Sequence, residues 1–446
     1  QATLGSASTL TFLLQYRYLL LLATVRYTVS RQLLCYWLLG NGTLKVDARH
    51  LNLPRLTPIM QLHAKTKCIL CCGVVTLVIV IFFLSIFSSC YSTPVSVLYQ
   101  DGDDLSTILP KLHSKVHTVR ILNYNMFLRS NPITDSGTKN DWKNERLALF
   151  INTELDKFDI LLLQEVWTPF SEGRKDQLIA AAKEMGFLYY VRSGCKGKLI
   201  DAMLLILSRH PIMSAEEFTY TNFVGDETHA SKGALGATIH LYGQQRCRTD
   251  VFTTHLQAGE SSNGGNEVRR SQTRELGAFV KSRTEGSSNP LMAIIGGDFN
   301  INGRTSKRNG TPSGFYVSLE EDLQHGLKPS IETSTNRSLI NMILPPWRQM
   351  NRKEADEWNV TDALPVTSPV RTLGSETSKL IGFDDSKGSA LDYIFVAMDE
   401  GSGGGGGGVQ PVKNRSIINA YRVRDQPFIA LSDHFGVEVA VVCSVE

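Results

Sequence analysis

Short apolar runs recur from about residue 117 to the end of the chain, separated by polar stretches, and this pattern predicts a β-rich domain. The runs that we interpret as strands are 118–127, 159–167, 202–208, 237–242, 249–256, 291–300, 390–398 and 436–443. Two stretches between them, 144–155 and 266–283, have the amphipathic spacing of helices. Many of the strands end on polar residues. The pattern therefore predicts a layered α/β domain with a site at the strand ends.

Two segments of this domain lack such periodicity. Residues 304–357 are polar and irregular, which predicts a large loop insertion. The run EGSGGGGGG at Glu400–Gly408 has the composition of a flexible linker. Candidate catalytic residues lie on both sides of this run. We therefore expect it to form a surface loop within one domain.

A longer apolar segment precedes the domain. Residues 68–90, CILCCGVVTLVIVIFFLSIFSSC, carry no charge. A helix of this length rises ~1.5 Å per residue and spans a hydrocarbon layer of ~30 Å, so we predict an N-terminal transmembrane helix. Basic residues precede the segment and acidic residues follow it, which favours a single-pass, type II protein with its catalytic domain extracellular or lumenal. Two shorter apolar runs, near 10–24 and 33–39, would change this topology if they are re-entrant.

Charge and cysteine content divide the chain in the same way. We expect a basic N-terminal region at 1–67 with short hydrophobic segments, a transmembrane helix at 68–90, a tether at 91–117 and a catalytic domain at 118–446. Residues 1–67 carry a net charge of +7 and the remainder −4, which disfavours nucleic acid as a partner. The large domain holds only Cys195, Cys247 and Cys443, so it contains at most one internal disulfide and no zinc-ligand spacing.

Eight polar residues follow or interrupt apolar strands, where an unpaired carboxylate would be costly. They are Asn125, Glu165, His255, Asp298, Asn300, Asp392, Asp433 and His434. Oxygen ligands without thiolates favour Mg²⁺, with Mn²⁺ as the alternative, over zinc. The set therefore predicts a hard cation bound at the strand ends.

In this order, the motifs ILNYNMF, LLLQEVW, TTHLQA, GGDFN, LDYIFV and LSDHF resemble the endonuclease/exonuclease/phosphatase superfamily of DNase I-like enzymes. The resemblance covers roughly residues 118–442. It implies a four-layer α/β sandwich of two packed mixed β-sheets flanked by helices. The superfamily includes DNase I-like nucleases, abasic endonucleases, inositol polyphosphate phosphatases and neutral sphingomyelinases.

The chain resembles the neutral sphingomyelinase branch in particular, through HLQA, VRRSQTREL, SRHPI and SKGALGATI. In that branch an Asp precedes the Lys of the Lys-Gly pair by five residues, whereas here Glu227 stands five residues before Lys232. The Trp-Cys-Asp-Arg run of the phosphoinositide phosphatases is absent. The resemblance implies that Lys232 contributes to substrate binding.

Phosphodiester hydrolysis requires charge neutralisation, deprotonation of water and stabilisation of the leaving group. We expect Glu165 to be the principal Mg²⁺ ligand, with Asn125 in support. His434 is the expected general base, since histidine titrates near neutrality. Asp392 would fix the tautomer of His434, as the orienting carboxylate of a catalytic triad does.

The other predicted site residues act on the phosphate. His255 would donate a hydrogen bond or a proton to the phosphoryl group, and Asn300 would bind a phosphate oxygen. Asp298 and Asp433 would position water, metal or the histidines.

The resemblance implies a membrane-bound hydrolase of sphingolipid metabolism that cleaves sphingomyelin to ceramide and phosphocholine. One alternative is an inositol phosphosphingolipid phospholipase C, and another is a membrane-tethered DNase I-like nuclease. A degenerate binding module is disfavoured because none of the eight positions is missing. The expected partners are a sphingolipid substrate and a membrane, without nucleic acid.

Overall fold

The chain divides into two compact units, Gln1–Ser92 and Thr93–Glu446. A computed structural model of the protein describes residues 116–130, 139–168, 171–196, 198, 200–243, 247–259, 264–284, 292–302, 318–319, 321–323, 337–341, 391–399, 409–411, 417–419, 421, 423, 426–428 and 430–444, together with Gly73 and Leu77. Among these residues, no helix has the length and apolarity to cross a membrane. The predicted transmembrane helix and tether lie almost wholly outside the described residues.

The second unit contains a mixed sheet of seven strands, called here the first sheet. Its path runs β11 (Val409–Pro411), β13 (Gly436–Ser444), β1 (Val116–Leu128), β2 (Ile160–Val166), β4 (Leu205–Ser208) and β3 (Tyr189–Arg192), with β12 (Ile417–Asn419) also paired to β13. Strands β1 and β2 are parallel, whereas β1 is antiparallel to β13 and β2 to β4. The C-terminal ends of the adjacent strands β1 and β2 therefore lie side by side at the same end of this sheet.

The second sheet, also mixed, has six strands. They run β5 (Ile212–Thr219), β6 (Gly233–His240), β7 (Arg248–His255), β8 (Met292–Asp298), β10 (Asp392–Asp399) and β9 (Arg337–Asn341). Strands β7 and β8 are parallel, and the other neighbours are antiparallel. Each sheet therefore has one parallel pair, and the site is built at the C-terminal ends of these pairs.

The two sheets pack face to face. Strand β2 is apolar on both faces because each face is buried in a different core. Ile160 and Leu162 point into the core between the sheets, where residues of both sheets meet. Leu161 and Leu163 point the other way, into a core shared with the helices α4 (Lys143–Thr153) and α5 (Arg174–Glu184). A strand buried on both faces has no polar side, so a continuous apolar run replaces simple alternation.

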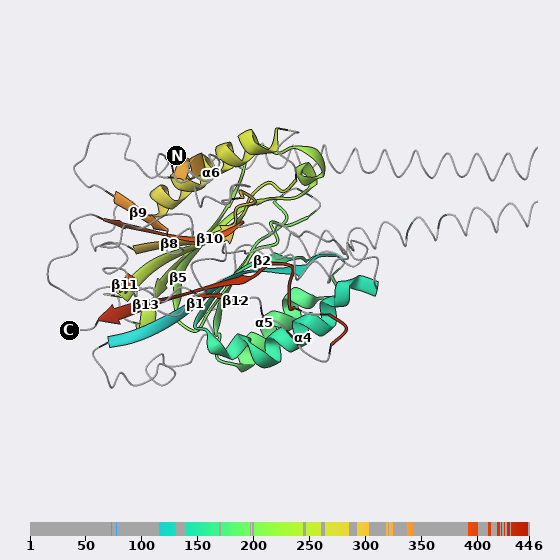
Figure 1. Cartoon of the computed structure of the whole chain (residues 1–446), viewed down its shortest axis with the longest axis horizontal. Helices are drawn as coiled ribbons and strands as arrows, with labels where there is room; N and C mark the ends of the chain where they lie inside the picture. The colour runs from blue at the N-terminus through green and yellow to red at the C-terminus, as the bar shows by residue number, and fades with distance from the viewer. Residues whose placement is uncertain are drawn as a thin grey trace, which may run out of the picture. The chain divides into compact units, whose positions relative to one another are not determined.

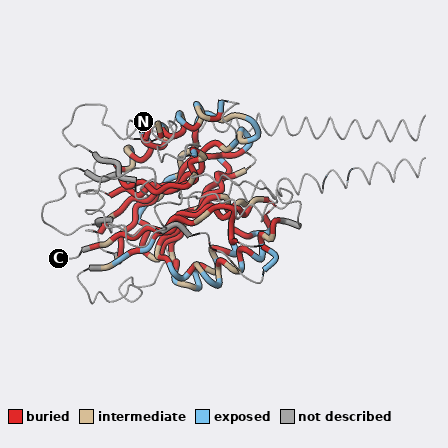
Figure 2. The backbone as a smooth tube through the Cα atoms, in the orientation of Figure 1, coloured by how far each residue is buried: buried red, intermediate tan, exposed pale blue. Residues whose placement is uncertain are grey.

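The long helix α6 (Gly265–Thr284) covers the outer face of the second sheet (Figure 1). Its Leu276 and Phe279 pack against Phe252 of β7 and Ile295 of β8. The described elements thus form helix, sheet, sheet and helix layers. Figure 2 shows that the central strands are buried, whereas the helices expose their outer faces. The predicted fold of two packed mixed sheets flanked by helices is confirmed.

Several described elements were absent from the sequence prediction. Helix α5 buries Arg174 and Lys175 in its first turn. Charged residues at buried positions interrupt the amphipathic pattern by which a helix is predicted from sequence. Strands β3 and β5 lie at sheet edges and are short or half-exposed. Strand β9 lies inside the predicted insertion 304–357 and pairs with β10, so that segment is not a loop throughout. Short 3₁₀ helices occur at Lys139–Trp142, Leu155–Lys157, Gly225–His229 and Leu241–Gly243.

A disulfide joins the sheets at the end opposite the site. Cys247 immediately precedes β7, and Cys443 lies in β13. Their Cα atoms are 5.7 Å apart, and both side chains are fully buried. The glycine run 400–408 lies outside the described residues. The strands on either side of it, β10 and β11, belong to the second unit but to different sheets.

Candidate active site

The predicted site residues come from strand ends in both sheets. In the second sheet, His255 pairs in register with Asp298, and Asp298 pairs with Asp392. In the first sheet, Asn125 of β1 lies beside Gln164, next to Glu165 at the end of β2. The packing of the sheets brings these two groups together. Residues far apart in the sequence therefore meet at one edge of the sandwich.

A buried chain of hydrogen bonds connects the sheets just behind the site. Gln164 donates through Nε2 to Asn123 Oδ1 at 2.8 Å and to Thr253 Oγ1 at 2.8 Å. A Cβ atom at Gly296 would lie 3.0 Å from Asn123 Oδ1, so glycine permits this close approach. Since these side chains are all buried, their hydrogen bonds fix how far apart the two halves of the site lie.

Asn125 lies at the centre of the site. Its Nδ2 donates to Asp298 Oδ2 at 3.0 Å and to Glu165 Oε1 at 3.2 Å, and it lies 3.4 Å from His434 Nε2. Its Oδ1 accepts a hydrogen bond from the backbone N–H of Phe127 at 3.0 Å. The amide nitrogen, rather than the oxygen, therefore faces the carboxylates. In this orientation the Asn125 amide bridges the two acidic residues, and its role beside the cation stays a prediction.

His434 forms a close pair with Asp392. The distance from His434 Nδ1 to Asp392 Oδ2 is 2.8 Å, and Nε2 lies 3.7 Å from Asp298 Oδ2. Burial lowers the pKa of His434, but the carboxylates of Asp392, Asp433 and Asp298 outweigh burial and raise this pKa well above its ordinary value. With Nδ1 held by Asp392, Nε2 is the ring nitrogen that faces the rest of the site.

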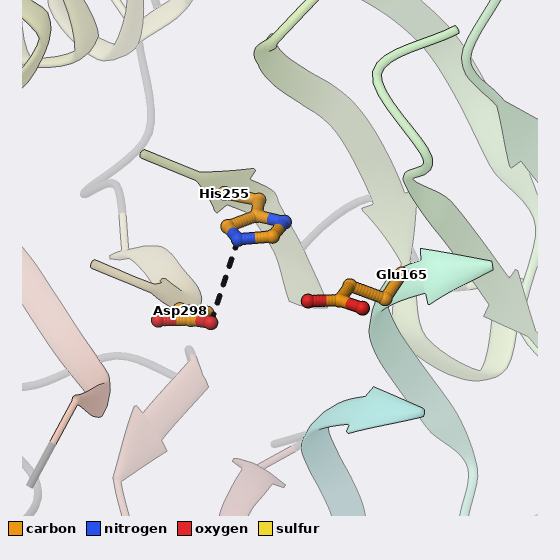
Figure 3. A group of neighbouring side chains, drawn as sticks. All are labelled: Glu165, His255 and Asp298. Atoms are coloured by element: carbon orange, nitrogen blue, oxygen red, sulfur yellow. Dashed lines mark ion pairs between the residues drawn. The ribbon is translucent and has the colours of Figure 1, made fainter. Parts of the chain in front are cut away.

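Asp298 and His255 form the second cluster, with Glu165 beside them (Figure 3). His255 Nε2 lies 3.5 Å from Asp298 Oδ2. Burial raises the pKa of Asp298, although the charge of His434 acts in the opposite direction. Burial, together with the charges of Lys232 and His434, lowers the pKa of His255 well below its ordinary value. This shift favours the neutral imidazole of His255. The ring is then suited to donate a hydrogen bond rather than to act as a general acid.

Asn300 and Asp433 lie beside these clusters. The backbone N–H of Asn300 donates to Asp298 Oδ1 at 2.9 Å, and its Nδ2 donates to Leu256 O at 3.2 Å. Asp433 Oδ1 accepts from Ser432 Oγ at 3.2 Å, and burial raises the pKa of Asp433. Both residues thus flank the central groups.

Lys232 lies behind His255, and its side chain is only 2% exposed. Its Nζ donates to Leu256 O at 2.8 Å and lies 2.7 Å from Glu227 Oε1. Glu227 is one methylene longer than the Asp that the resemblance implies at this position, and it still forms the ion pair with Lys232. In this structure the ammonium group supports the backbone next to His255, and it does not point into open space.

The donor atoms fit a hard cation. Glu165, His255 and Asp298 each offer a ligand atom within 4.8 Å of the others, and so do Asp298, Asp392 and His434. Glu165 Oε2 is buried and has no hydrogen-bond partner among the described residues. A buried carboxylate oxygen without a donor is costly, and a divalent cation would satisfy it.

Sequence reasoning missed two features of the site. Phe127 and Glu165 have left-handed backbones with φ of 51° and 53°, each costing about 1–3 kcal/mol for a non-glycine residue. Arg129 follows β1 directly, and its Nε lies 3.8 Å from Glu165 Oε2. The signal for Arg129 was present, because a charge directly after an apolar strand is the same pattern that marked the other site residues.

Comparison with known proteins agrees with this geometry. A model of the endonuclease/exonuclease/phosphatase family matches residues 123–434, which includes all eight of the strand-end residues. The chain belongs to this family. The family membership accounts for the two packed sheets and for the ordered set of polar strand ends.

Within the family, the chain is similar to proteins named as sphingomyelinases. It is 24% identical over 339 residues to a sphingomyelinase of Dictyostelium discoideum, a match that covers 64% of this chain and 71% of that protein. It is 30% identical over 164 residues to sphingomyelin phosphodiesterase 3 of Homo sapiens, covering 33% of this chain and 25% of the human protein. A crystal structure of sphingomyelinase C from Streptomyces griseocarneus is 17% identical, with 73% of this chain and 99% of that chain covered and a TM-score of 0.48.

Proposed function

We propose that this family member is a Mg²⁺-dependent phosphodiesterase of the phospholipase C type that hydrolyses sphingomyelin to ceramide and phosphocholine. The observation that carries the proposal is the set of contacts of Asn125, which link Glu165 and His434, on the side of the first sheet, to Asp298 of the second sheet. Similarity to two sphingomyelinases supports the choice of substrate within the family.

His434 is the general base of the proposed reaction. Asp392 accepts a hydrogen bond from Nδ1–H of His434. Once a bound cation offsets the carboxylates that raise the pKa of His434, the neutral imidazole would present the lone pair of Nε2 to the site. A water molecule next to Nε2 loses its proton to this nitrogen as its oxygen attacks phosphorus. The bond from phosphorus to the ceramide oxygen then breaks, the leaving oxygen takes up a proton from solvent, and phosphocholine keeps the phosphate.

Glu165 and Asp298 are the residues that would hold the cation, with Mn²⁺ as an alternative to Mg²⁺. A bound Mg²⁺ supplies positive charge that polarises the phosphoryl group and offsets the carboxylates around His434. Asn125 donates to both acidic residues, so it maintains their separation. Asp433 contributes negative charge to the same region.

His255 and Asn300 act on the phosphate oxygens. Because His255 is held neutral, one ring N–H remains available for a hydrogen bond to the phosphoryl group. Asn300 uses one of its two amide N–H donors on Leu256 O and keeps the other for a phosphate oxygen. Lys232 fixes the backbone next to His255 and supports this arrangement from behind.

The proposed location is a membrane, with the catalytic domain on its extracellular or lumenal side. The disulfide between Cys247 and Cys443 supports this side, since such bonds persist in oxidising compartments. A membrane tether would also bring the enzyme to a lipid substrate at high effective concentration. Protease added to intact cells should digest an extracellular domain, and protease added to sealed microsomes should spare a lumenal one. Protection in intact cells together with digestion in sealed microsomes would place the domain in the cytosol and contradict the proposal.

A substrate panel tests the function. The purified full chain should release phosphocholine from sphingomyelin in the presence of Mg²⁺, and it should leave supercoiled plasmid intact. Efficient nicking of the plasmid with no cleavage of sphingolipids would instead identify a nuclease. Cleavage of only inositol phosphosphingolipid would keep the reaction and change the head group.

A further inference from the structure

Helix α4 buries an arginine against the end of β1. Arg146 is 1% exposed, and its guanidinium carbon lies 5.5 Å from the centroid of the Phe127 ring. A buried charge is costly unless polar groups satisfy it. The hydrogen-bond partners of Arg146 therefore indicate what the fold gains from a charge at this position.

Arg146 donates four hydrogen bonds to backbone oxygens. Its Nη1 donates to Met126 O at 3.0 Å and to Leu431 O at 2.7 Å. Its Nη2 donates to Phe127 O at 2.7 Å, and its Nε donates to Asp141 O at 2.9 Å. One guanidinium group thus joins the end of β1 to the segment that precedes β13.

These two segments carry two groups of the site. Asn125 directly precedes the bonded carbonyl groups of β1, and His434 follows Leu431 by three residues. The register of β1 with β2 shifts between Asn125 and Leu128, and Phe127 has a left-handed backbone. Such a bulge disrupts the ladder of hydrogen bonds between strands. The sheet alone therefore does not hold this part of β1.

The hydroxyl group of Ser432 provides a second link between the same segments. Its Oγ donates to Asn125 O at 2.6 Å and accepts a hydrogen bond from the backbone N–H of His434 at 3.2 Å. Within the site, Asn125 Nδ2 lies 3.4 Å from His434 Nε2. This distance depends on how the two backbone segments are held together.

We propose that Arg146 is a positioning residue: together with the Ser432 hydroxyl, it sets the separation of Asn125 and His434. A displacement of about 1 Å in an active site can lower the rate about 10²-fold, so a clamp on these two segments has a direct effect on turnover. The inference rests on the roles proposed for Asn125 and His434, and it does not depend on the head group of the lipid.

A purely structural role predicts a different result. If Arg146 only stabilises the packing of α4 on the first sheet, its replacement lowers the unfolding temperature and leaves kcat per folded molecule unchanged. If Arg146 positions the site, kcat falls and KM changes little, because His255 and Asn300, the groups proposed to contact the phosphate, come from the ends of β7 and β8. The separate changes in kcat and KM therefore distinguish the two roles.

The chain offers a matched control at the end of the first sheet opposite the site. Arg209 Nε donates to Phe158 O at 2.9 Å, and its Nη2 donates to Asp156 O at 3.3 Å. Its guanidinium carbon lies 4.4 Å from the centroid of the Phe187 ring. Arg209 therefore repeats the backbone partners and the aromatic ring of Arg146, next to the beginning of β2 rather than its end.

The experiment compares Arg146→Lys, Ser432→Ala and Arg209→Lys with the wild type, in the full chain at saturating Mg²⁺. Lysine keeps the charge, but its three donors on one nitrogen cannot reproduce four hydrogen bonds to separate segments. For each protein, kcat and KM for sphingomyelin are measured per folded molecule, together with the unfolding temperature.

We expect Arg146→Lys to lower kcat about 10- to 10²-fold and to leave KM within about threefold of the wild type. Ser432→Ala should lower kcat by a smaller factor, because Arg146 still joins the segments. Arg209→Lys should lower the unfolding temperature and leave kcat within about twofold of the wild type, since it is distant from the site.

A kcat per folded molecule in Arg146→Lys as close to the wild type as that of Arg209→Lys would overturn the inference. If Arg146→Lys does not fold, Ser432→Ala decides, and an unchanged kcat in that variant overturns the inference.

A failure of the proposed function has a different signature, because the wild type would then cleave no sphingomyelin. Crystal structures of the wild type and of the folded variants in that case measure the distance from Asn125 Nδ2 to His434 Nε2 directly. A longer distance in Arg146→Lys or Ser432→Ala supports the positioning role without any turnover, and an unchanged distance contradicts it.

Discussion

The buried carboxylates at the two ends of the sandwich differ in their hydrogen-bond and charge partners, although the same strands connect the two ends. At the site end, Asp298 and Asp392 pair in register and lie close to Glu165 and His434. Burial and mutual repulsion raise the pKa of Asp298, and Glu165 keeps an oxygen without a hydrogen-bond partner. This end is therefore electrostatically unfavourable until a cation binds.

At the opposite end the buried carboxylate of Asp250 has polar partners. It accepts a hydrogen bond from Thr238 Oγ1 and lies 3.2 Å from Arg248 Nη2. Nearby, the bond between Cys247 and Cys443 joins the sheets. The comparison indicates that one end stabilises the fold and the other sacrifices stability for chemistry. Substitutions at the two ends should consequently affect different measurements.

The largest expected effect is loss of turnover at the site end. His434→Ala, Glu165→Ala and Asp298→Ala should each lower kcat about 10²–10⁴-fold, because each removes the general base or a cation ligand. Their unfolding midpoints should remain close to that of the wild type or rise, since Glu165→Ala and Asp298→Ala relieve repulsion. Asp250→Asn is the control, with little change in kcat and a lower unfolding midpoint. Near-normal turnover in any site variant would remove that residue from the scheme.

Removal of the cation should have a comparable effect on activity. EDTA should abolish turnover, and Mg²⁺ or Mn²⁺ should restore it, because the ligand set consists mainly of oxygen atoms. Thermal unfolding with and without Mg²⁺ gives an independent measurement. The cation should raise the unfolding temperature of the wild type and not that of Glu165→Ala. Full activity in EDTA, or restoration by Zn²⁺ alone, contradicts the assignment.

Removal of the disulfide should affect mainly stability. We expect Cys247→Ala combined with Cys443→Ala to lower the free energy of unfolding by about 2–5 kcal/mol. Turnover per folded molecule at 20 °C should stay within about twofold of the wild type, because the bond lies at the end opposite the site. Denaturant unfolding and active-site titration measure the two quantities. A large fall in kcat with unchanged stability would contradict the assignment of this end to stability and of the other end to catalysis.

The smallest effect concerns Glu217, whose side chain is 2% exposed and accepts hydrogen bonds from Gly194 N–H. Burial raises the pKa of Glu217 from 4.5 to about 7. The folded state therefore binds this proton more tightly, so the contribution of Glu217 to stability is greatest below pH 4.5 and is lost as the pH rises through about 7. Glu217→Gln should flatten this dependence by roughly 1–3 kcal/mol, measured by denaturant unfolding across the range. Parallel curves for variant and wild type would contradict the shift.

The buried strands were predictable because their sequences reflect burial directly. In β2, both Leu161 and Leu162 lie in cores on opposite faces, so the apolar run marks the strand. Helix α5 was not predictable, because its first turn buries Lys175 in contact with Asp201. A lysine indicates an exposed position unless its partner is known, and that partner is distant in sequence.

The site was predictable in composition and not in orientation. Asp298 and His434 interrupt apolar stretches, and that position marks them without a structure. The direction of the Asn125 amide and the burial of Lys232 depend on which strands become neighbours. The left-handed backbone at Glu165 has no sequence signal at all, since glutamate rarely adopts it.

The central claim is hydrolysis of sphingomyelin at the bond between phosphorus and the ceramide oxygen. The most direct measurement is cleavage of sphingomyelin by the purified full chain in ¹⁸O-labelled water with Mg²⁺, with mass spectrometry of both products. We predict ¹⁸O in phosphocholine, none in ceramide, and at least about 10²-fold slower product formation by Glu165→Ala. Release of free choline with ceramide phosphate, or absence of turnover in wild type supplied with Mg²⁺, would contradict the account.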